Sequence, residues 1–277
     1  INTKKHVISL ANIDEMKTHE SYHIGAMVSL HELEHGPTHP LIRKAAGTIA
    51  STLIRRSGTV GGNLCLDTRC FWFNQTEDWR RSIDWCHKCD CDTNADCRVI
   101  PNQNTLCVAT YQGDLAPCMM VLGAKIHLAG PEGQRSLKLD EFYALDGMKR
   151  NVLELGEFVT HITLPIESDE LEGDYQKLRL RESWDFPEAG VSAAWITGDT
   201  STLRVASTAL ESIPRLHSEQ VAELSEKLST NNVTALSESV MKSIKPVNNT
   251  ALPPRYRRAM VKVLAKRSLK KIMEATE

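Results

Sequence analysis

The sequence has no long apolar run and no marked excess of charge of either sign. Its 277 residues include 33 Lys and Arg against 35 Asp and Glu, which gives a formal net charge of −2. This near-neutral balance gives no electrostatic argument for binding nucleic acid or an anionic membrane. No apolar segment reaches the roughly 18–20 residues that a transmembrane helix needs, and no signal peptide is recognisable. We therefore expect a cytoplasmic protein with no membrane span and no nucleic-acid partner.

Several motifs that would indicate a catalytic class are also missing. The glycine-rich stretch GTVGGN at residues 58–63 has no Gly-Lys-Ser/Thr and lacks the spacing of a dinucleotide fingerprint. No internal repeat, low-complexity tract, Ser–His–Asp set or paired carboxylates stand out. Glu32, Glu34 and His35 are typical of a solvated helix surface. We therefore assign no catalytic residue to this chain.

The length is sufficient for two domains of an α+β fold. An acidic stretch at 167–174 predicts the boundary between them. The spacing of apolar residues predicts strands at 5–10, 21–30, 175–181 and 190–197, and helices at 39–58, 218–228, 233–244 and 255–275. Between these halves, a short helix ended by Gly123 is followed by a strand, and mixed loop and strand run to Pro165. The last helix carries a basic face, which we interpret as solvated.

A glycine-rich turn at residues 58–63 is the first candidate for binding. Its glycines leave the backbone free to adopt positive φ angles. Exposed N–H groups, together with the Thr59 hydroxyl and the Asn63 amide, suit a diphosphate. A tight structural turn between two elements explains the same residues, so the sequence leaves both interpretations open.

All eight cysteines lie between Cys65 and Cys118. Without a secretory signal, this pattern favours metal or iron–sulfur ligation over disulfides. Iron in sulfide clusters prefers thiolate donors, and four cysteines are spread widely enough to wrap around a four-iron cluster: Cys70, Cys86, Cys97 and Cys107. The spacing Cys86-x2-Cys89 also suits zinc, and free or disulfide-bonded thiols are a third interpretation. Three tryptophans in the same segment would shield a cluster from water or form a small core: Trp72, Trp79 and Trp85.

The residues then show a resemblance to a known family. The stretch SYHIGAMVSLHELEHGPTHPLIRKAAGTIASTLIRRSGTVGGNLC resembles the FAD-binding subunit of the molybdenum hydroxylase (xanthine dehydrogenase) family. The insertion CLDTRCFWFNQTEDWRRSIDWC, the cysteines after it and GDLAPCMMVLGAKI resemble the β subunit of 4-hydroxybenzoyl-CoA reductases, which carries an additional [4Fe–4S] cluster in such an insertion. The likeness continues through YQKLRLRESWDFPEAGVSAA to PPRYRRAMVKVLAKRSL.

The resemblance implies an α+β architecture with two parts. The first is an FAD-binding PCMH-type (VAO-like) domain at residues 1–167, with an iron–sulfur insertion at 65–110. The second, at 172–277, is a C-terminal domain like that of the CO dehydrogenase flavoprotein, with a small antiparallel sheet and helices. The family begins with a further subdomain whose AGGT-type loop contacts the diphosphate, and Ile1 falls just after its expected end. We expect that subdomain to be missing here, so the chain is a fragment, the segment is separate, or FAD binding is weakened or lost.

The resemblance also implies roles for particular residues. The FAD diphosphate would be contacted by Thr59, Gly61, Gly62 and Asn63. Asp114 would help to hold the adenosine part of FAD, and the flavin would be lined by Val159, Gln176 and Lys177. The ligands of the [4Fe–4S] cluster would be Cys70, Cys86, Cys97 and Cys107. Because the loop from Cys86 to Cys97 is longer than the family pattern, Cys89 or Cys91 is an alternative ligand within it.

The function implied is that of an electron-transfer flavo-iron–sulfur subunit. Its partners would be a large molybdopterin-binding subunit and a small [2Fe–2S] subunit, with ferredoxin as an external donor. The assembly would reductively remove a phenolic hydroxyl from an aromatic acyl-CoA, with the active site in a partner subunit. The alternative is a non-catalytic scaffold that is stabilised by zinc and has lost flavin binding.

Overall fold

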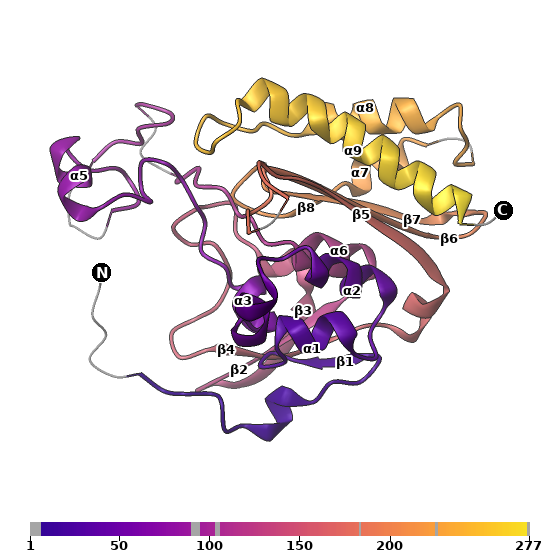
Figure 1. Cartoon of the computed structure of the whole chain (residues 1–277), viewed down its shortest axis with the longest axis horizontal. Coiled ribbons are helices and arrows are strands. Elements are labelled where there is room, and N and C mark those ends of the chain that lie inside the picture. The colour runs from indigo at the N-terminus through magenta and orange to yellow at the C-terminus, as the bar shows by residue number, and fades with distance from the viewer. Residues whose placement is uncertain (1–6, 90–94, 103–105, 183, 225–226, 276–277) are drawn as a thin grey trace.

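The chain forms two antiparallel four-stranded sheets with helices between and outside them (Figure 1). The structure, a computed structural model, describes residues 7–89, 95–102, 106–182, 184–224 and 227–275. The first sheet has the order β1–β4–β2–β3, and its strands are His23–Gly25, Phe158–Thr163, Lys125–Gly130 and Gly133–Lys138. The second has the order β5–β6–β7–β8, and its strands are Leu171–Leu178, Ala189–Ile196, Asp199–Thr208 and Arg215–Leu216. The predicted α+β class, with a small antiparallel sheet and helices in the C-terminal half, is confirmed.

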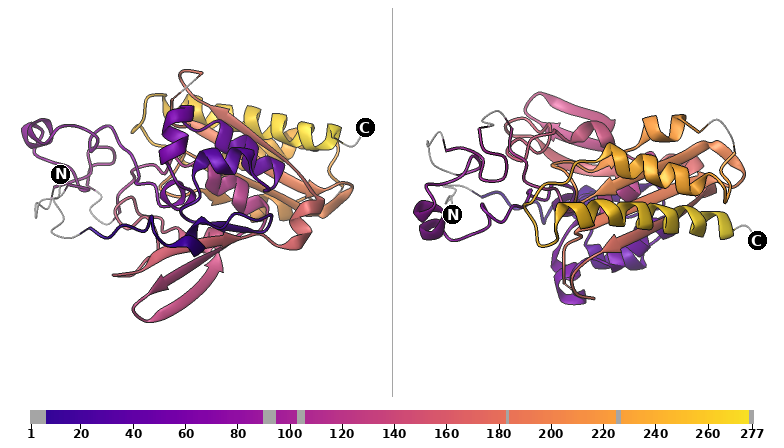
Figure 2. Two further views of the ribbon diagram at one scale, coloured as in Figure 1. Left: turned by 60° about the horizontal axis from the view of Figure 1, so that its bottom comes forward. Right: turned by 90° about the horizontal axis from the view of Figure 1, so that it is seen from above.

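The helices fall into an inner and an outer group. The inner group lies between the sheets or beside the first: α1 (Leu30–His35), α2 (Pro40–Gly47), α3 (Thr52–Ser57), α4 (Val60–Leu64) and α6 (Leu115–Val121). The outer group lies on the second sheet: α7 (Ser218–Ala222), α8 (Val233–Ser243) and α9 (Pro254–Glu274). Three short 3-10 turns are η1 (Asp14–Lys17), η2 (Leu139–Phe142) and η3 (Ile166–Glu170). Figure 2 shows α8 and α9 side by side across the strands of the second sheet.

Two segments at the centre of the molecule explain how the layers join. All seven residues of α6 are buried, as expected for a helix that is apolar on every side. This helix packs against the inner face of β6 and β7. Strand β6 is also buried on both faces, because α9 covers its other side. Its continuous apolar sequence AGVSAAWI is typical of a strand without a solvated face.

The helix predicted at 39–58 is interrupted, which the periodicity did not indicate. Helix α2 ends at Gly47, and Ala50 has a φ of 45° in the left-handed region. Ser51 then caps α3 by accepting a hydrogen bond from the Ile54 N–H at 3.4 Å. The apolar residues keep a helical spacing, but a capped break turns the chain between them. This break shapes the binding pocket described below.

Other predicted boundaries also need correction. The described residues 7–10 form no strand, with 5–6 outside the described residues, and the strand predicted at 21–30 shrinks to β1. The acidic stretch at 167–174 is no free linker: η3 is followed at once by β5, whose first residue, Leu171, is buried. Helix α7 ends at Ala222, short of the predicted 228. Strand β7, the longest in the second sheet, was not predicted.

The cysteine-rich segment extends from one end of the molecule in every view (Figures 1 and 2). Its described residues include the short helix α5 (Glu77–Ser82), which is capped by Thr76 and has no buried residue. Across the part of the chain that is described, no helix combines the length and apolarity needed to cross a membrane.

A buried histidine between β8 and α7 is expected to make stability depend on pH. His217 is 1% exposed, and its ring nitrogens bond to the Ser207 hydroxyl at 2.9 Å and the Ser243 hydroxyl at 3.1 Å. Burial, assisted by Arg215, lowers its pKa from 6.5 to about 4. Between these values the unfolded chain binds more protons than the folded one, so we expect the free energy of unfolding to fall by up to about 3 kcal/mol as pH drops through this window. Urea unfolding at pH 7 and pH 4.5 measures this.

His217→Gln is the matched control because glutamine does not titrate. We expect its stability to change less than that of the parent chain over the same window. An identical pH dependence in both proteins would contradict the assignment to His217.

Candidate functional site

The glycine-rich turn forms the short helix α4, capped by the Thr59 hydroxyl, which accepts the Gly62 N–H at 3.1 Å. Four further N–H groups of the turn are bonded within the chain: Gly58 to Ile54 O at 2.8 Å, Val60 to Val28 O at 3.0 Å, Gly61 to Ala26 O at 2.8 Å and Asn63 to Thr59 O at 2.9 Å. None of the turn's glycines has a positive φ. The expectation of a positive-φ loop is therefore wrong, and five of the six N–H groups of the turn are already used by helix formation and by pairing with residues 26–28.

The two adjacent glycines have different surroundings. A Cβ on Gly61 would lie 2.9 Å from the Ala26 Cβ and 3.1 Å from the Ala26 oxygen, so Gly61 permits close packing of α4 on the chain beside β1. A Cβ on Gly62 would meet only the Thr59 hydroxyl, at 3.1 Å. Gly61 therefore positions the turn, while Gly62 leaves space in front of it.

That space belongs to a pocket of about 220 Å³, lined mainly by residues of the first half together with Trp184, Asp185 and Phe186 of the second. Of the residues implied for FAD, the pocket is lined by Thr59, Gly62, Asn63 and Asp114. Its other walls are Leu30, Ile49, Ala50, Ile54, Gly58, Leu66, Trp184, Asp185 and Phe186. A mostly apolar hollow with a few polar groups at one side is the usual character of a cofactor site.

Three cationic side chains, Arg55, Lys177 and Arg179, hold one wall of this pocket, the loop between α2 and α3. Arg55 donates to the Ile49 carbonyl at 2.8 Å. Lys177 and Arg179 both donate to the Thr48 carbonyl, at 3.0 and 3.3 Å. These contacts satisfy carbonyls left open by the helix break and tie the wall to β5.

Asp114 lies behind the pocket with its carboxylate already occupied. It accepts the Tyr175 hydroxyl at 2.7 Å and pairs with the Lys177 ammonium at 3.0 Å, and both charged side chains are at most 5% exposed. Burial raises the pKa of Asp114 and lowers that of Lys177, and their mutual attraction opposes both shifts. The carboxylate therefore joins α6 to β5, and Lys177 reaches the pocket wall.

The remaining residues implied for FAD lie elsewhere. Gly61 faces Ala26 rather than the pocket. Val159 is buried in the first core on β4, opposite Leu128, and does not line the pocket. The Gln176 amide donates to the Asp174 carboxylate at 2.7 Å.

The second candidate site is in the cysteine-rich segment. Four cysteines are 5–8% exposed and line one cavity of about 20 Å³: Cys70, Cys86, Cys97 and Cys107, hereafter the cavity cysteines. Trp72 and Phe73 pack on the same side. Of the others, Cys65 lies at the end of α4 and Cys118 inside α6, while Cys91 lies outside the described residues. Cys89 does not line the cavity and donates its N–H to the Cys86 carbonyl at 2.9 Å.

Backbone N–H groups face the sulfur of each cavity cysteine. Ile100 N–H donates to the Cys97 sulfur at 3.5 Å and Ala109 N–H to the Cys107 sulfur at 3.4 Å. Hydrogen bonds from Trp72 and Phe73 to Cys70, and from Lys88 to Cys86, oppose the effect of burial on those thiols. Burial itself raises the pKa of Cys70 to about 11 and that of Cys107 to about 12. Such N–H groups favour the thiolate form, which a bound metal or cluster requires of its cysteine ligands.

The spacing of the sulfurs bears on the choice between zinc and a cluster. Zinc–sulfur bonds of about 2.3 Å in a tetrahedron place two sulfurs about 3.8 Å apart. In the described part of the chain, no three cysteine sulfurs lie within 4.8 Å of one another. The donor set of four thiols suits a four-iron cluster.

Three side chains on α1 have ligand atoms within 4.8 Å of one another, which is close enough to hold a metal ion: His31, Glu34 and His35. Glu34 is already ion-paired there, accepting from Arg55 at 2.8 Å. Ser29 and Glu32 form a capping box at the start of the same helix.

The sequence did not indicate two residues near these sites: Lys88 beside the cysteine cavity, and Phe186 between that cavity and the first pocket. Lys88 lines the cysteine cavity. A further pocket of about 340 Å³ is lined by both Cys70 and Phe186, and Phe186 also lines the first pocket. Arg69 lies over the Phe186 ring, 4.5 Å from its centre. The sequence around Phe186 does not indicate this contact, because its partner Arg69 lies more than a hundred residues away in the chain.

Comparison with known families places the first pocket in context. Residues 1–167 match the family described as the FAD-binding domain in molybdopterin dehydrogenase. The chain belongs to this family.

Two relatives of this FAD-binding domain are FAD subunits of an aldehyde oxidoreductase and of a nicotinate dehydrogenase. The aldehyde oxidoreductase FAD-binding subunit PaoB of Escherichia coli (strain K12) is 28% identical over 213 residues, 70% of this chain and 64% of PaoB. The nicotinate dehydrogenase FAD-subunit of Eubacterium barkeri is 26% identical over 232 residues, 79% of this chain and 63% of that protein. The alignments therefore span somewhat less than two thirds of each relative.

The fold of this FAD-binding family extends over both sheets. Reconstituted CO dehydrogenase from Oligotropha carboxidovorans matches 94% of this chain and 79% of its own, with a TM-score of 0.70 at 19% identity. At this level of identity the likeness shows the fold alone. It confirms the second half as a domain like that of the CO dehydrogenase flavoprotein.

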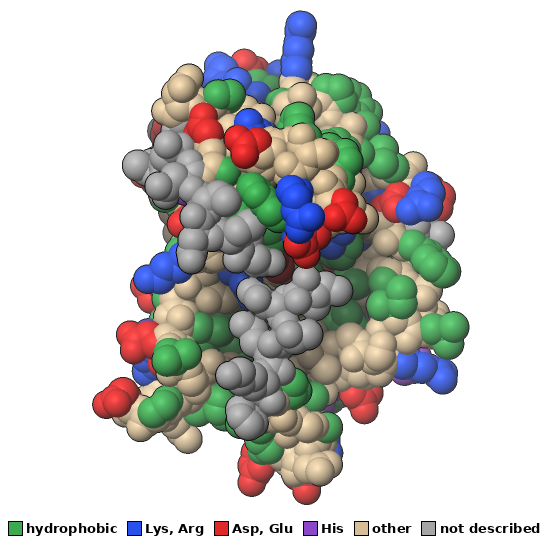
Figure 3. Space-filling view, turned by 90° about the vertical axis from the view of Figure 1, so that its left-hand side faces the viewer, with side chains coloured by type: hydrophobic (Ala, Val, Ile, Leu, Met, Phe, Trp, Pro, Cys, Tyr) green, Lys and Arg blue, Asp and Glu red, His purple; other side chains and the backbone are tan. Residues whose placement is uncertain are grey.

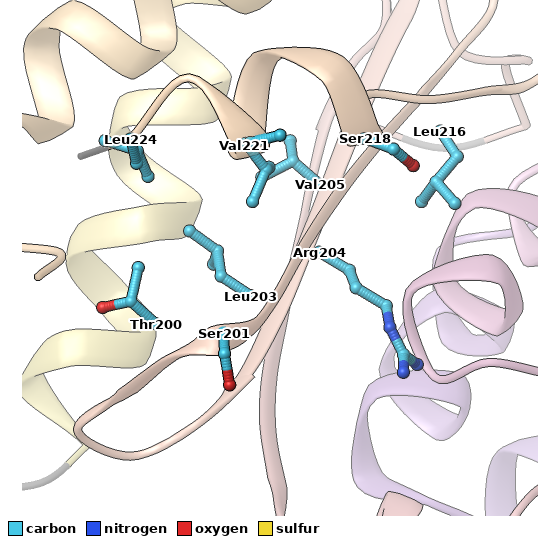
Figure 4. A pocket seen from close by; sticks show the side chains of 10 residues that line it. Thr200, Ser201, Leu203, Arg204, Val205, Leu216, Ser218, Val221 and Leu224 are labelled. Carbon is cyan, nitrogen blue, oxygen red and sulfur yellow. The ribbon is translucent and has the colours of Figure 1, made fainter. Parts of the chain in front are cut away.

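A larger pocket in this FAD-binding protein has a different character (Figure 4). It has a volume of about 500 Å³ between β7 and α7, and is lined by Leu203, Val205 and Val221 among others. Of its lining residues only Arg204 is ionisable, and that guanidinium donates to the Val121 carbonyl at 3.2 Å, away from the pocket. This pocket therefore offers no acid or base that faces its interior.

The end of the molecule that carries the cysteine segment has mixed chemistry (Figure 3). Hydrophobic side chains there alternate with Lys, Arg, Asp and Glu, without a patch of one charge. Phe71, Trp184 and Phe186 are 39–63% exposed near the two sites.

Proposed function

We propose that this chain is the electron-transfer flavo-iron–sulfur subunit of a molybdenum-containing oxidoreductase. FAD lies in the pocket in front of Gly62, and a [4Fe–4S] cluster is held by the cavity cysteines. When bound, the two groups exchange electrons with carriers outside this chain. The partners we propose are a molybdopterin-binding subunit, a small [2Fe–2S] subunit and a ferredoxin-like donor. The resemblance of the cysteine insertion supports a reductive dehydroxylation of an aromatic acyl-CoA by the assembly.

One observation carries the iron–sulfur part of the proposal: four buried thiols from distant positions, each faced by backbone N–H groups, meet at one cavity. A small hydrophobic core would need neither four cysteines nor donors aimed at their sulfurs. The chain's own residues then orient the ligands, exclude water with Trp72 and Phe73, and supply hydrogen bonds that set the potential.

For the flavin, the chain offers an apolar pocket wall and polar side chains that are held in place, rather than a row of free backbone N–H donors. The groups that face the pocket are the Thr59 hydroxyl, the Asn63 side chain and the open space at Gly62. Asn63 is held in place because its side-chain oxygen accepts the Leu115 N–H at 3.3 Å. We propose Thr59, Gly62 and Asn63 as the diphosphate contacts, with Asp114 and Lys177 holding them from behind.

Metal and flavin analysis of the anaerobically purified protein, produced with its neighbouring subunits, tests the proposal. We expect about four irons and four acid-labile sulfides per chain, together with FAD. Zinc without iron would overturn the iron–sulfur assignment and support the zinc-stabilised scaffold. Iron without FAD would overturn the flavin assignment alone.

The two glycines of the turn provide a sharper prediction for the flavin. We expect Gly61→Ala to lower the free energy of unfolding by about 1–3 kcal/mol, because its Cβ would be forced against Ala26. We expect Gly62→Ala to be closer to the parent in stability but to bind FAD at least tenfold more weakly, because its methyl group would project beside Thr59 into the pocket. Thermal unfolding and flavin titration separate the two effects, and equal FAD affinity in Gly62→Ala and the parent would place the diphosphate elsewhere.

A further inference from the structure

Lys88 lines the cysteine cavity and carries a buried ammonium group. Its side chain is 8% exposed, although lysine is rarely buried without a role. The nitrogen donates to the Thr68 hydroxyl at 2.6 Å, the Thr68 carbonyl at 2.9 Å and the Asp67 carboxylate at 2.8 Å. It also lies 4.9 Å from the centre of the Phe73 ring, which packs at the same cavity.

These hydrogen bonds require the charged form of the amine. The Thr68 hydroxyl donates its own hydrogen to the Gly147 carbonyl at 2.5 Å, so it must accept from Lys88. The carbonyl and the carboxylate are acceptors as well. Three acceptors need three N–H donors, which an ammonium has and a neutral amine lacks.

The charged groups around Lys88 do not neutralise its positive charge at the cavity. Asp67 is 52% exposed and is shared with Arg150, whose guanidinium lies 3.5 Å away. Arg98 also lines the cavity, but its guanidinium is bonded to the carbonyls of Trp85 at 2.8 Å and Asp84 at 2.6 Å. The ammonium of Lys88 is therefore the most buried full charge at this cavity among the described residues.

We propose that Lys88 is a positioning residue whose fixed charge makes one-electron reduction of the group held by the cavity cysteines more favourable. This inference rests on the iron–sulfur assignment proposed above. Four thiolates leave a four-iron centre with net negative charge, and one further electron adds to it. A cation in a region of low dielectric stabilises the added electron more than surface charges do. The electron comes from an external low-potential one-electron donor, no bond is made or broken, and Lys88 keeps its protons.

The test compares three substitutions in the full chain. Lys88→Met and Lys88→Gln remove the charge, and Lys88→Arg keeps it. Lys149→Met is the matched control, because it removes one positive charge from an exposed position on the loop that covers Cys107. Iron and sulfide are determined first, and the midpoint potential is then measured anaerobically by dithionite titration, followed by visible absorption and electron paramagnetic resonance.

We expect both neutral variants to lower the equilibrium constant for reduction at least tenfold, which is 59 mV for one electron. Lys88→Arg and Lys149→Met should stay within threefold of the parent. An unchanged potential in a neutral variant with full iron and sulfide overturns the role of Lys88 and leaves the proposed function standing. A parent protein without iron overturns both. Loss of the cluster in both neutral variants, with retention in Lys88→Arg, assigns Lys88 to assembly and overturns the inference as stated.

Discussion

Replacing Cys97 by serine is expected to reduce the iron content from about four atoms per chain to less than one. Cys97 is 6% exposed, lines the cavity with the other three cavity cysteines, and accepts the Ile100 N–H. A serine oxygen is a harder donor than a thiolate and is closer to its Cα, so it replaces the lost ligand poorly. Iron and acid-labile sulfide analysis of anaerobically purified protein, with the visible absorption of the cluster, measures the loss.

Cys89→Ser is the control for this variant, since it changes a thiol in the same segment. Cys89 lies three residues from Cys86 but does not line the cavity. We expect Cys89→Ser to retain full iron and sulfide. Equal loss in the two variants would show that Cys89 is a ligand, and retention by Cys97→Ser would remove Cys97 from the ligand set.

Replacing Asp114 by alanine is expected to lower the free energy of unfolding by about 3–5 kcal/mol. The substitution leaves the Lys177 ammonium buried without its carboxylate and removes the acceptor of the Tyr175 hydroxyl. The destabilisation follows from the uncompensated charge rather than from a lost contact with flavin. Urea unfolding of the flavin-free chain at pH 7 measures it.

Two controls separate the charge from the hydrogen bond at Asp114. Tyr175→Phe keeps the ion pair and removes one hydrogen bond, which should cost about 1 kcal/mol. The double variant Asp114→Leu/Lys177→Met removes both charges and should recover much of the lost stability. If Asp114→Ala unfolds at the same urea concentration as the parent, the carboxylate has no structural role and its buried pairing with Lys177 is energetically neutral.

The sequence predicts those parts of the fold that depend on local pattern. Helices α8 and α9, strand β6 and the Gly123 helix end follow from periodicity, apolar runs and a residue with positive φ. The helix break after Gly47 was missed because the apolar spacing continues across it. Strand β7 was missed because most of its residues are polar and give little alternation. Its packing against β6 and α7 identifies it as a strand.

The candidate sites likewise combine features that a local sequence pattern predicts with features that it does not. Cysteine spacing and the family motifs, both local in sequence, were enough to name four candidate ligands and a glycine turn. The use of the turn's N–H groups by Val28 and Ala26 could not be read from the turn itself, since those acceptors are about thirty residues away. The pairing of Asp114 with Lys177 likewise joins α6 to β5.

The sequence by itself therefore determined the family, the set of thiols and the residue types at the turn, because each is written in a short stretch of chain. Only the tertiary structure decided which groups face each cavity, where Lys88 places its charge and which expected contacts are already used inside the protein. Those properties depend on burial and on hydrogen-bond partners from distant segments, and no local pattern specifies which distant segment supplies them.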